Sequence, residues 1–538
     1  GITPVLNNLG NLYKDKGDYV TAELLYQRAF DIRERSLEPD HLLIASSLNS
    51  LANIKRTKGE DDKATALYRR ALEIREKALG PEHPEVATSL NNLANTYNES
   101  DADYDKAEPL YRRALAIREK VLGPEHPDVA QTLYNLVVYY GSKGDYARAE
   151  PLCRRALSIL EKSLGPEHPY ISYSLNALAI IAKNTGDYAR AESLYRRAIA
   201  IKEKGQGPYH PEVGGSLTNL ANLYAVKGEV DKAVATQSRA NDILERNIAL
   251  NLAVGSERQK LAYVASLSEI TDRTLTLHLR TAPNNSEAAG LALTTVLQRK
   301  GRVLDAMSDS LGALRRRLDK RDQSLFDQLS EATAKLVGLV LSGPQDTAPA
   351  EHPQQITALE ERRERLESEI SRRSAGFYEQ SKPVTPDAVR AAIPAGAALI
   401  EFATYRPVAP TSHEFAPART LDTNAVGSPR YVAYVIRGRG DVRWAELGEA
   451  REIDGAIDEW REALRDPSRK DVRQLARAVD ERVMRPVRAF VGDAAQLLVS
   501  PDGELNLIPF EALVDERHRF LVERYAFTYL TSGRDLLR

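Results

Sequence analysis

The first half of the chain repeats itself with a period of about 42 residues. The motif Gly-Pro-Glu-His-Pro occurs three times, one variant precedes these copies and another follows them, and the histidine of the motif recurs at intervals of 42, 43, 42 and 42 residues. The histidines are His41, His83, His126, His168 and His210. A period of this length, kept over several copies, is typical of a solenoid in which each unit packs only against its neighbours. This feature excludes a single compact core for residues 1–247.

Each unit contains two helical patterns. The first, helix A, reads Leu-x-x-Leu-Ala-x-x-Tyr at Leu90–Tyr97, and the second, helix B, reads Ala-x-x-x-Tyr-x-x-Ala at Ala107–Ala114. Small residues let the two helices approach closely, and the aromatic ring fills the gap between them. At these residues the array resembles the tetratricopeptide repeat (TPR), and the 42-residue period with its linking motif looks like the kinesin-light-chain type. We expect six units over residues 1–247.

Two features of the array could be taken for functional sites, a metal site and a nucleophile. The histidine series resembles a set of metal ligands, but equivalent residues of stacked repeats lie on the order of 10 Å apart, whereas zinc ligands share one ion at about 2 Å. Cys153 stands in the tyrosine column of helix B in the fourth unit. We therefore predict structural histidines at the junctions, a buried core cysteine, and neither a metal site nor a cofactor.

The candidate binding surface lies on helix A, whose packing leucines are interspersed with asparagines. Two of these columns are four residues apart and so share a face of the helix. In the family that the array resembles, helix A lines the concave surface, and an amide offers donors and acceptors to an extended peptide. The alternative is a solvated face or hydrogen bonding within the array. The predicted peptide-binding residues are Asn7, Asn11, Asn49, Asn53, Asn91, Asn92, Asn95, Asn135, Asn219 and Asn222.

The period is lost after residue 247, but helical patterns continue. We assign residues 248–390 to a helical connector, with one helix over Glu257–Thr281 and a salt-bridged, coiled-coil-like arm over Gln355–Ser381. Residues 391–538 read as an α/β domain. Ala397–Tyr405 predicts a strand, Tyr431–Ile436 and Val442–Leu447 predict a hairpin, and the apolar run Gln496–Ser500 predicts a central strand. Leu507–Leu513 is expected to start a helix.

A TPR array, a helical connector and then the stretches Gly396–Phe402, Leu497–Leu513 and Tyr529–Leu536 resemble the bacterial TPR–CHAT proteins. The most specific part runs from Pro-Asp-Gly to Pro-Phe-Glu-Ala-Leu. The resemblance implies a caspase-like fold and a cysteine endopeptidase, with its histidine and cysteine on later strands. The sequence ends at Arg538, before both motifs, so no residue is assigned as catalytic. We interpret His518 as a histidine of a charged surface turn. We expect Gln496–Ser500 to lack a neighbour on one edge and the fragment to aggregate.

Composition narrows the class of partner. Lys and Arg number 74 against 76 Asp and Glu, which leaves no overall attraction to nucleic acid or an anionic membrane. One cysteine excludes an internal disulfide and fits a reducing, cytoplasmic compartment. The first residue is Gly1, and we expect residues before it. Two functions fit: an array that binds a peptide or protein and regulates a caspase-like endopeptidase, or a scaffold whose CHAT domain is inactive.

Overall fold

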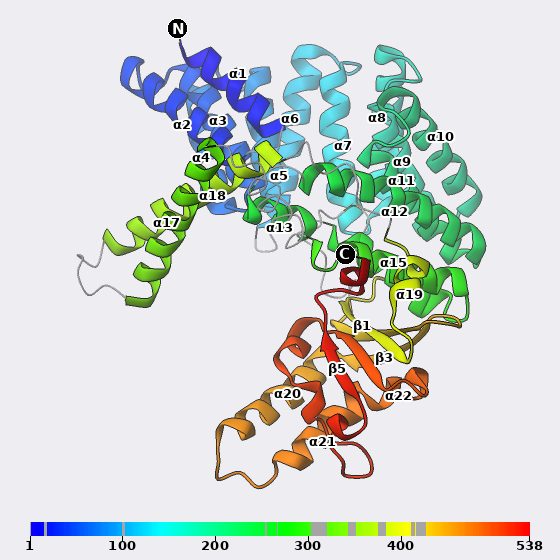
Figure 1. Cartoon of the computed structure of the whole chain (residues 1–538). Helices are drawn as coiled ribbons and strands as arrows, with labels where there is room; N and C mark the ends of the chain where they lie inside the picture. Colours follow the sequence, from blue (N-terminus) through cyan, green and yellow to red (C-terminus); the bar gives the residue numbers. More distant parts are fainter. Residues whose placement is uncertain are drawn as a thin grey trace. The chain divides into compact units, whose positions relative to one another are not determined.

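The computed structural model describes residues 2–15, 19–98, 103–252, 256–265, 267–302, 320–342, 351–374, 384–409, 415 and 427–537. The chain forms two compact units, which divide between Leu223 and Tyr224. Helices alone build the first unit up to that point, and the second holds the remaining helices and one sheet (Figure 1). The expected class, a helical TPR solenoid followed by a helical region and an α/β part, is confirmed.

Helix A and helix B alternate where the period predicts them. Their bounds are α1 Ile2–Asp15, α2 Tyr19–Ser36, α3 Leu42–Thr57, α4 Asp61–Leu79, α5 Pro84–Asn98, α6 Ala107–Leu122, α7 Pro127–Ser142, α8 Tyr146–Leu164, α9 Ile171–Asn184, α10 Tyr188–Gln206, α11 Pro211–Val226 and α12 Val230–Leu252. The inserted residue falls where a 3₁₀ turn, Tyr104–Lys106, precedes α6. The first alanine of each helix B is fully buried, and so is the ring of Tyr68 or Tyr111 that follows.

The linking motif ends one helix and starts the next. Gly80 has φ +83°, a conformation that residues with a side chain rarely adopt, and the glycine recurs with positive φ at the three later links, Gly123, Gly165 and Gly207. The histidine of the motif then caps helix A. The His83 Nδ1 accepts a hydrogen bond from the Glu85 backbone N–H at 3.2 Å, and His41, His126, His168 and His210 make the same contact. The junction histidines are therefore structural, as predicted, because each accepts a hydrogen bond from a backbone N–H at the start of helix A, and His41 and His126 are the N-cap residues of α3 and α7.

The connector is less continuous than expected. The segment predicted as one helix consists of α13 Glu257–Ala265, α14 Ser268–Thr276 and a π-helical turn, η2 Leu277–Thr281. α15 Ser286–Arg299 follows, and α17 Lys320–Ser342 and α18 Glu351–Ser374 lie side by side in the arm (Figure 1). The single-helix prediction was wrong because α13 ends at Ala265 and α14 begins at Ser268, a break that the apolar spacing does not reveal.

Five strands form one sheet in the order β3-β2-β1-β4-β5. They are β1 Ala397–Tyr405, β2 Arg430–Arg437, β3 Arg443–Glu449, β4 Gln496–Ser500 and β5 Ala526–Tyr529. β1, β4 and β5 are parallel, whereas β2 and β3 run antiparallel to their neighbours. The expected bare edge at Gln496–Ser500 is thus wrong, because β5 pairs there. Among the described residues the edge strands are β3 and the four-residue β5, so the reason for expecting aggregation through β4 is gone.

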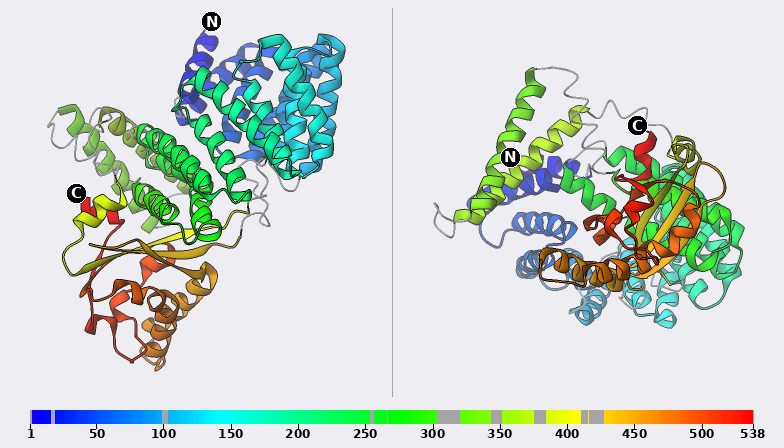
Figure 2. Two further views of the ribbon diagram at one scale, coloured as in Figure 1. Left: turned by 90° about the vertical axis from the view of Figure 1, so that its right-hand side faces the viewer. Right: turned by 60° about the horizontal axis from the view of Figure 1, so that its bottom comes forward.

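Helices cover both faces of the sheet (Figure 2). On one face, α20 Ala450–Arg465, α21 Val472–Val483 and α22 Arg485–Val491 bury Ile457, Trp460 and Val483 against β1 and β4. On the other, α14, η2, α15 and α19 Pro386–Ala392 bury residues such as Leu293 and Leu297 against β1 and β2. Leu507–Leu513 contains short 3₁₀ turns and no α-helix, which corrects the prediction there. Helices of the predicted connector therefore form one layer of the α/β unit.

Candidate functional site

The predicted asparagines divide by column into three different environments. In helix A of the third unit, Asn91 is 4% exposed and donates from Nδ2 to the Thr132 Oγ1 of the next unit at 3.0 Å. The Asn7 amide lies beside the Arg33 guanidinium, and the Asn49 Oδ1 is buried. The first column thus lies between repeats, where the alternative of hydrogen bonding within the array applies.

The third column contacts helix B of its own unit. The Tyr26 hydroxyl donates to the Asn11 Oδ1 at 2.6 Å, and Tyr68 and Tyr111 make the same bond to Asn53 and Asn95 at 2.5 and 2.6 Å. Asn11 and Asn53 are exposed, and Asn95 is half-buried. Because the tyrosine occupies the amide oxygen, the amide nitrogen is the group that each residue can offer to a ligand.

The second column and the sixth unit complete the predicted set. Asn92, Asn135, Asn219 and Asn222 are all partly exposed. The Asn219 Nδ2 donates to the Asn176 Oδ1 of the preceding unit at 3.5 Å. Asn91 is thus the buried member of the predicted set, and the most exposed members, Asn11 and Asn53, belong to the third column; the amides of the second column are partly exposed. These columns lie three residues apart on helix A, and this spacing also places them on one face.

The sequence contained a signal for the Asn–Tyr contact that the prediction missed. That signal is partial: in the fourth unit Val138 and Cys153 replace both partners, but the fifth unit keeps Tyr195 with Ile180 and the sixth keeps Asn222 with Gln237. Cys153 is fully buried, as predicted, and its Sγ donates to the Ser174 carbonyl at 3.3 Å. Burial raises the pKa of this thiol to about 12, so it is not a nucleophile at neutral pH.

A second contact between repeats also went unpredicted, and we call it the cation–hydroxyl joint. A buried cation of helix B donates to a hydroxyl on helix A of the next unit, and burial lowers the pKa of each cation. The pairs are Arg33–Ser47 at 2.7 Å, Arg75–Ser89 at 2.6 Å, Arg118–Thr132 at 2.8 Å and Lys202–Ser216 at 3.1 Å. In the fourth unit Leu160 replaces the cation, and the buried Ser174 Oγ has no hydrogen-bond partner among the described residues.

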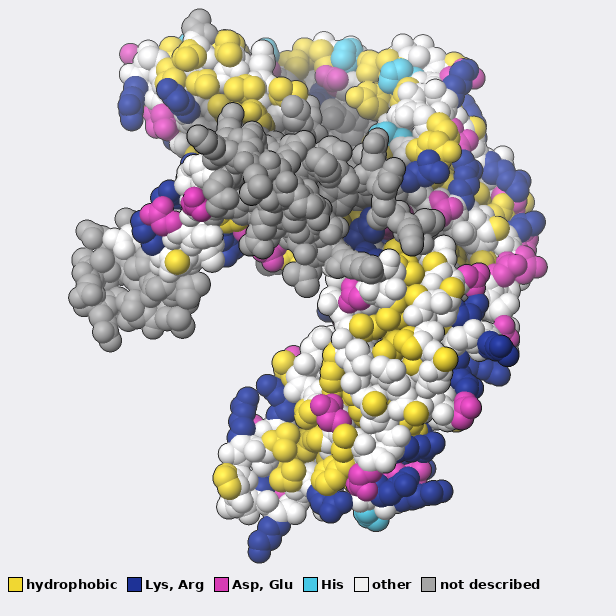
Figure 3. Space-filling model, in the orientation of Figure 1, with side chains coloured by type: hydrophobic (Ala, Val, Ile, Leu, Met, Phe, Trp, Pro, Cys, Tyr) yellow, Lys and Arg dark blue, Asp and Glu magenta, His cyan; other side chains and the backbone are white. Residues whose placement is uncertain are grey.

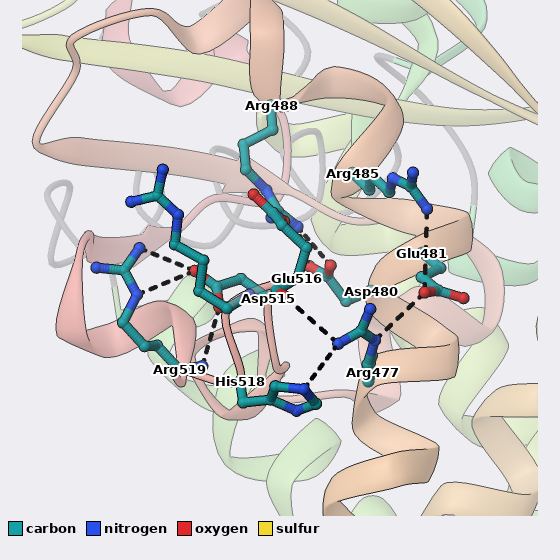
Figure 4. A network of polar contacts seen from close by, with 10 residues as sticks. Arg477, Asp480, Glu481, Arg485, Arg488, Asp515, Glu516, His518 and Arg519 are labelled. Atoms are coloured by element: carbon teal, nitrogen blue, oxygen red, sulfur yellow. Dashed lines mark hydrogen bonds and ion pairs between the residues drawn. The ribbon is translucent and has the colours of Figure 1, made fainter.

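His518 lies in a charged turn at the surface, as predicted. It has φ +60°, and its Nε2 is 3.4 Å from the Arg477 Nη1 (Figure 4). Beneath the turn, Arg488 binds both oxygens of the buried Asp480 and also Glu516. Desolvation raises the pKa of Asp480 to about 6 against the pull of Arg488. These contacts are those of a structural ion-pair network that holds the turn on α21 and α22.

A further polar cluster lies where the carboxyl end of β4 pairs with the middle of β1. The Lys300 Nζ, directly after α15, donates to the Glu401 Oε1 at 2.9 Å, the Phe402 carbonyl at 2.8 Å and the Ser500 carbonyl at 2.9 Å. Glu401 is fully buried, and its Oε2 accepts from the Gly533 backbone N–H at 2.6 Å. Lys300, Glu401, Phe402, Ser500 and Gly533 thus join α15, both strands and the segment after β5.

The described residues contain neither a membrane-spanning helix nor a metal-ligating cluster. No helix in the described part of the chain is long and apolar enough to cross a bilayer. Within the described ranges no cluster of His, Cys, Asp and Glu could hold a metal ion. Figure 3 shows basic and acidic side chains interspersed over the α20–α22 region, and hydrophobic ones gathered over α1, where Ile2, Val5, Leu9 and Leu12 are exposed.

Comparison with solved structures finds only partial likeness. A putative kinesin light chain from Podosopora anserina with nearly identical TPR-like repeats is 27% identical, covering 38% of this chain and 96% of its own, with a TM-score of 0.33. BtubC (BKLC) from P. vanneervenii is 24% identical, covering 43% and 90%, with a TM-score of 0.36. A Rap protein complexed with competence and sporulation factor is 14% identical, covering 69% and 98%, with a TM-score of 0.35. No curated protein matches.

Family models match both halves of the chain. Tetratricopeptide repeat models match residues 2–77, 48–119, 99–152, 137–204 and 176–244, and the CHAT domain model matches residues 473–538. The first matches cover the helix pairs of the array, and the last runs from α21 through β4 and β5. The chain therefore contains tetratricopeptide repeats and, after them, a CHAT domain match.

Proposed function

We propose that the repeats bind a peptide or protein through helix A and thereby regulate a caspase-like cysteine endopeptidase domain. In this proposal residues 391–538 belong to that domain, and none of them is assigned as its catalytic histidine or cysteine. TPR solenoids present extended binding surfaces, which supports the first half of the proposal. The CHAT match over residues 473–538 supports the second.

The observation that carries the binding proposal is the Asn–Tyr contact of the first three units. Asn11, Asn53 and Asn95 recur at one position of helix A, and each has its oxygen fixed by a tyrosine hydroxyl. Three amide nitrogens in equivalent places give a row of donors with fixed orientation. Such a row suits the carbonyl groups of an extended peptide, because a preorganised donor loses little entropy on binding.

The test removes the donors and keeps the contact. We expect the triple variant Asn11→Asp, Asn53→Asp and Asn95→Asp to retain the bond from each tyrosine hydroxyl and lose the amide N–H groups. Peptides selected from a displayed random library on the wild-type chain should then bind about 100-fold more weakly, since each net hydrogen bond contributes about 1 kcal/mol. Titration calorimetry measures the affinity.

Two controls accompany the triple variant. Asn184→Asp changes an asparagine whose amide bonds the Ile180 carbonyl of its own helix, and it should leave affinity unchanged. The melting curve of the triple variant should match that of the wild-type chain. An unchanged affinity in the triple variant would place the binding surface elsewhere.

The scaffold alternative has its own supporting observation. The one cysteine of the chain is Cys153, which is buried in the array with a raised pKa. A thiol-reactive, active-site-directed probe, applied to the protein read from its whole coding sequence, distinguishes the two functions. Labelling that disappears when a cysteine after Arg538 is changed to alanine supports the endopeptidase. No labelling, in the presence of a selected peptide, supports the scaffold.

A further inference from the structure

The sheet changes direction between β1 and β4. From β1 the chain continues to β2 on one side, and from β4 it continues to β5 on the other side. In open α/β sheets, a ligand usually binds near the carboxyl ends of two such parallel strands. Here Ser500 ends β4, and its register partner Glu401 lies with Phe402 in the middle of β1; we call the place beside these three residues the crevice.

An ammonium group from the chain itself occupies this crevice. The Lys300 Nζ is within 2.9 Å of one carboxylate oxygen and two carbonyl oxygens, and 2.7 Å from the Ser500 Oγ. An ammonium has three protons in tetrahedral directions, which suits three acceptors on one side of a nitrogen. One buried carboxylate, Glu401, balances its single charge. The adjoining carboxyl end of α15 also favours a cation.

The same carboxylate holds the segment that leaves β5. The Glu401 Oε2 accepts from the Gly533 N–H, and the Ser500 Oγ lies 3.1 Å from the Thr531 carbonyl. Gly301 follows Lys300 with φ +70°, and a Cβ there would come within 2.8 Å of the Thr531 Cγ2. The end of α15 therefore touches both the crevice and the segment 531–533.

We propose that the crevice between β1 and β4 is a binding site for a primary ammonium group, that Lys300 fills it, and that this contact fixes the segment 531–533 relative to α15. Through this contact of Lys300, any displacement of α15 is transmitted to the segment that follows β5. The site depends neither on what the array binds nor on peptidase activity.

The test removes the ammonium and then supplies it from solution. In the full chain, Lys300→Ala should lower the melting midpoint by about 10 °C when followed by tryptophan emission, because it leaves a buried carboxylate unpaired. Both tryptophans, Trp444 and Trp460, lie in the sheet unit. n-Propylammonium, which replaces the lost atoms, should raise the midpoint of the variant saturably and leave the wild-type midpoint unchanged.

Tetramethylammonium, a cation without N–H groups, should give no rescue at the same ionic strength. Lys335→Ala, which removes an exposed lysine paired with Glu331 in the same unit, should leave the midpoint unchanged. A wild-type midpoint for Lys300→Ala, or equal rescue by tetramethylammonium, would overturn the ammonium site. Hydrogen exchange tests the coupling, since exchange at 531–533 should be faster in Lys300→Ala and unchanged within α3–α10. Unaltered exchange at 531–533 would overturn the coupling.

If Lys300→Ala does not fold, Lys300→Met replaces it, because methionine keeps most of the stem. Adding Glu401→Gln to Lys300→Met should then raise the midpoint of the single variant, because the unpaired carboxylate is gone. A further fall on adding Glu401→Gln would show that the two residues act independently and would overturn the proposal.

Discussion

A buried cation and a hydroxyl hold successive repeats together at most junctions of the array. Arg75 is 7% exposed and donates to Ser89 across the junction between the second and third units. At the junction between the fourth and fifth units the equivalent hydroxyl, Ser174, faces no cation, because Leu160 stands in its place. The junction between the fourth and fifth units is therefore a natural control for the energy of the cation–hydroxyl joint.

Alanine at these two serines should give different losses of stability. Ser89→Ala removes the acceptor of a buried guanidinium, and we expect it to lower the free energy of unfolding by about 1.5–3 kcal/mol. Ser174→Ala removes a hydroxyl that makes no hydrogen bond in the described part of the chain, and its effect should stay within about 0.5 kcal/mol. Urea unfolding followed by circular dichroism measures both. Equal losses would mean that the joint contributes nothing beyond packing.

Part of the structure of the repeat array could be predicted from the sequence. The repeat phase located both helices of each unit and the buried Cys153, because packing columns recur with the period. The cation–hydroxyl joint could also have been predicted, since Arg or Lys precedes Ser or Thr by 14 residues in the units that have it. The burial of Asn91 between repeats was not, because the prediction assumed which side of helix A faces the next unit.

The helices that cover the sheet show a second limit of prediction from the sequence. The apolar residues of α14, η2 and α15 predicted helices, but an apolar face does not name the surface that it packs on. In the structure His278, in the π-helical turn, is fully buried, with its Nδ1 3.0 Å from the Tyr434 hydroxyl and its ring 4.9 Å from that of Trp444. A residue that pattern analysis passed over therefore sits between the helical layer and β2 and β3.

Protonation of His278 should weaken this layer. Desolvation lowers the pKa of His278 from 6.5 to about 4, so between these values the unfolded chain binds a proton that the folded chain does not. The contribution is complete above pH 6.5 and is lost as the pH falls toward 4, amounting to about 3 kcal/mol. Trp444 emission during urea unfolding at a series of pH values follows the change.

The variant His278→Gln isolates this effect from other groups. Burial raises the pKa of Asp272 to about 6, which opposes the histidine over part of the same range. Because Asp272 is common to both proteins, the stability of the wild-type chain relative to His278→Gln should fall as the pH is lowered from 6.5 to 4. A difference that does not vary with pH would show that the histidine titrates alike in both states.

At the scale of the whole molecule, two compact units share one chain. Optical signals separate them, since both tryptophans lie in the sheet unit whereas helices are present in each. We expect heating to give two steps in circular dichroism, of which only one coincides with the change in tryptophan emission, because units with separate cores need not unfold together.

Ser89→Ala identifies the steps. It lies in the first unit, so it should move only the step that tryptophan emission does not report. A single transition, at the same temperature by both signals, would show instead that the units unfold as one cooperative body.

The cluster at Lys300 has a consequence for the order in which the protein is made. Its contacts span up to 200 residues, whereas the joints of the array span 14. The repeats can therefore fold as they leave the ribosome, but the apolar face of α15 has no sheet to cover until β1 and β2 are synthesised. At about 5–20 residues per second, that face waits on the order of 10–30 s. During translation it is therefore an exposed apolar surface to which a chaperone can bind.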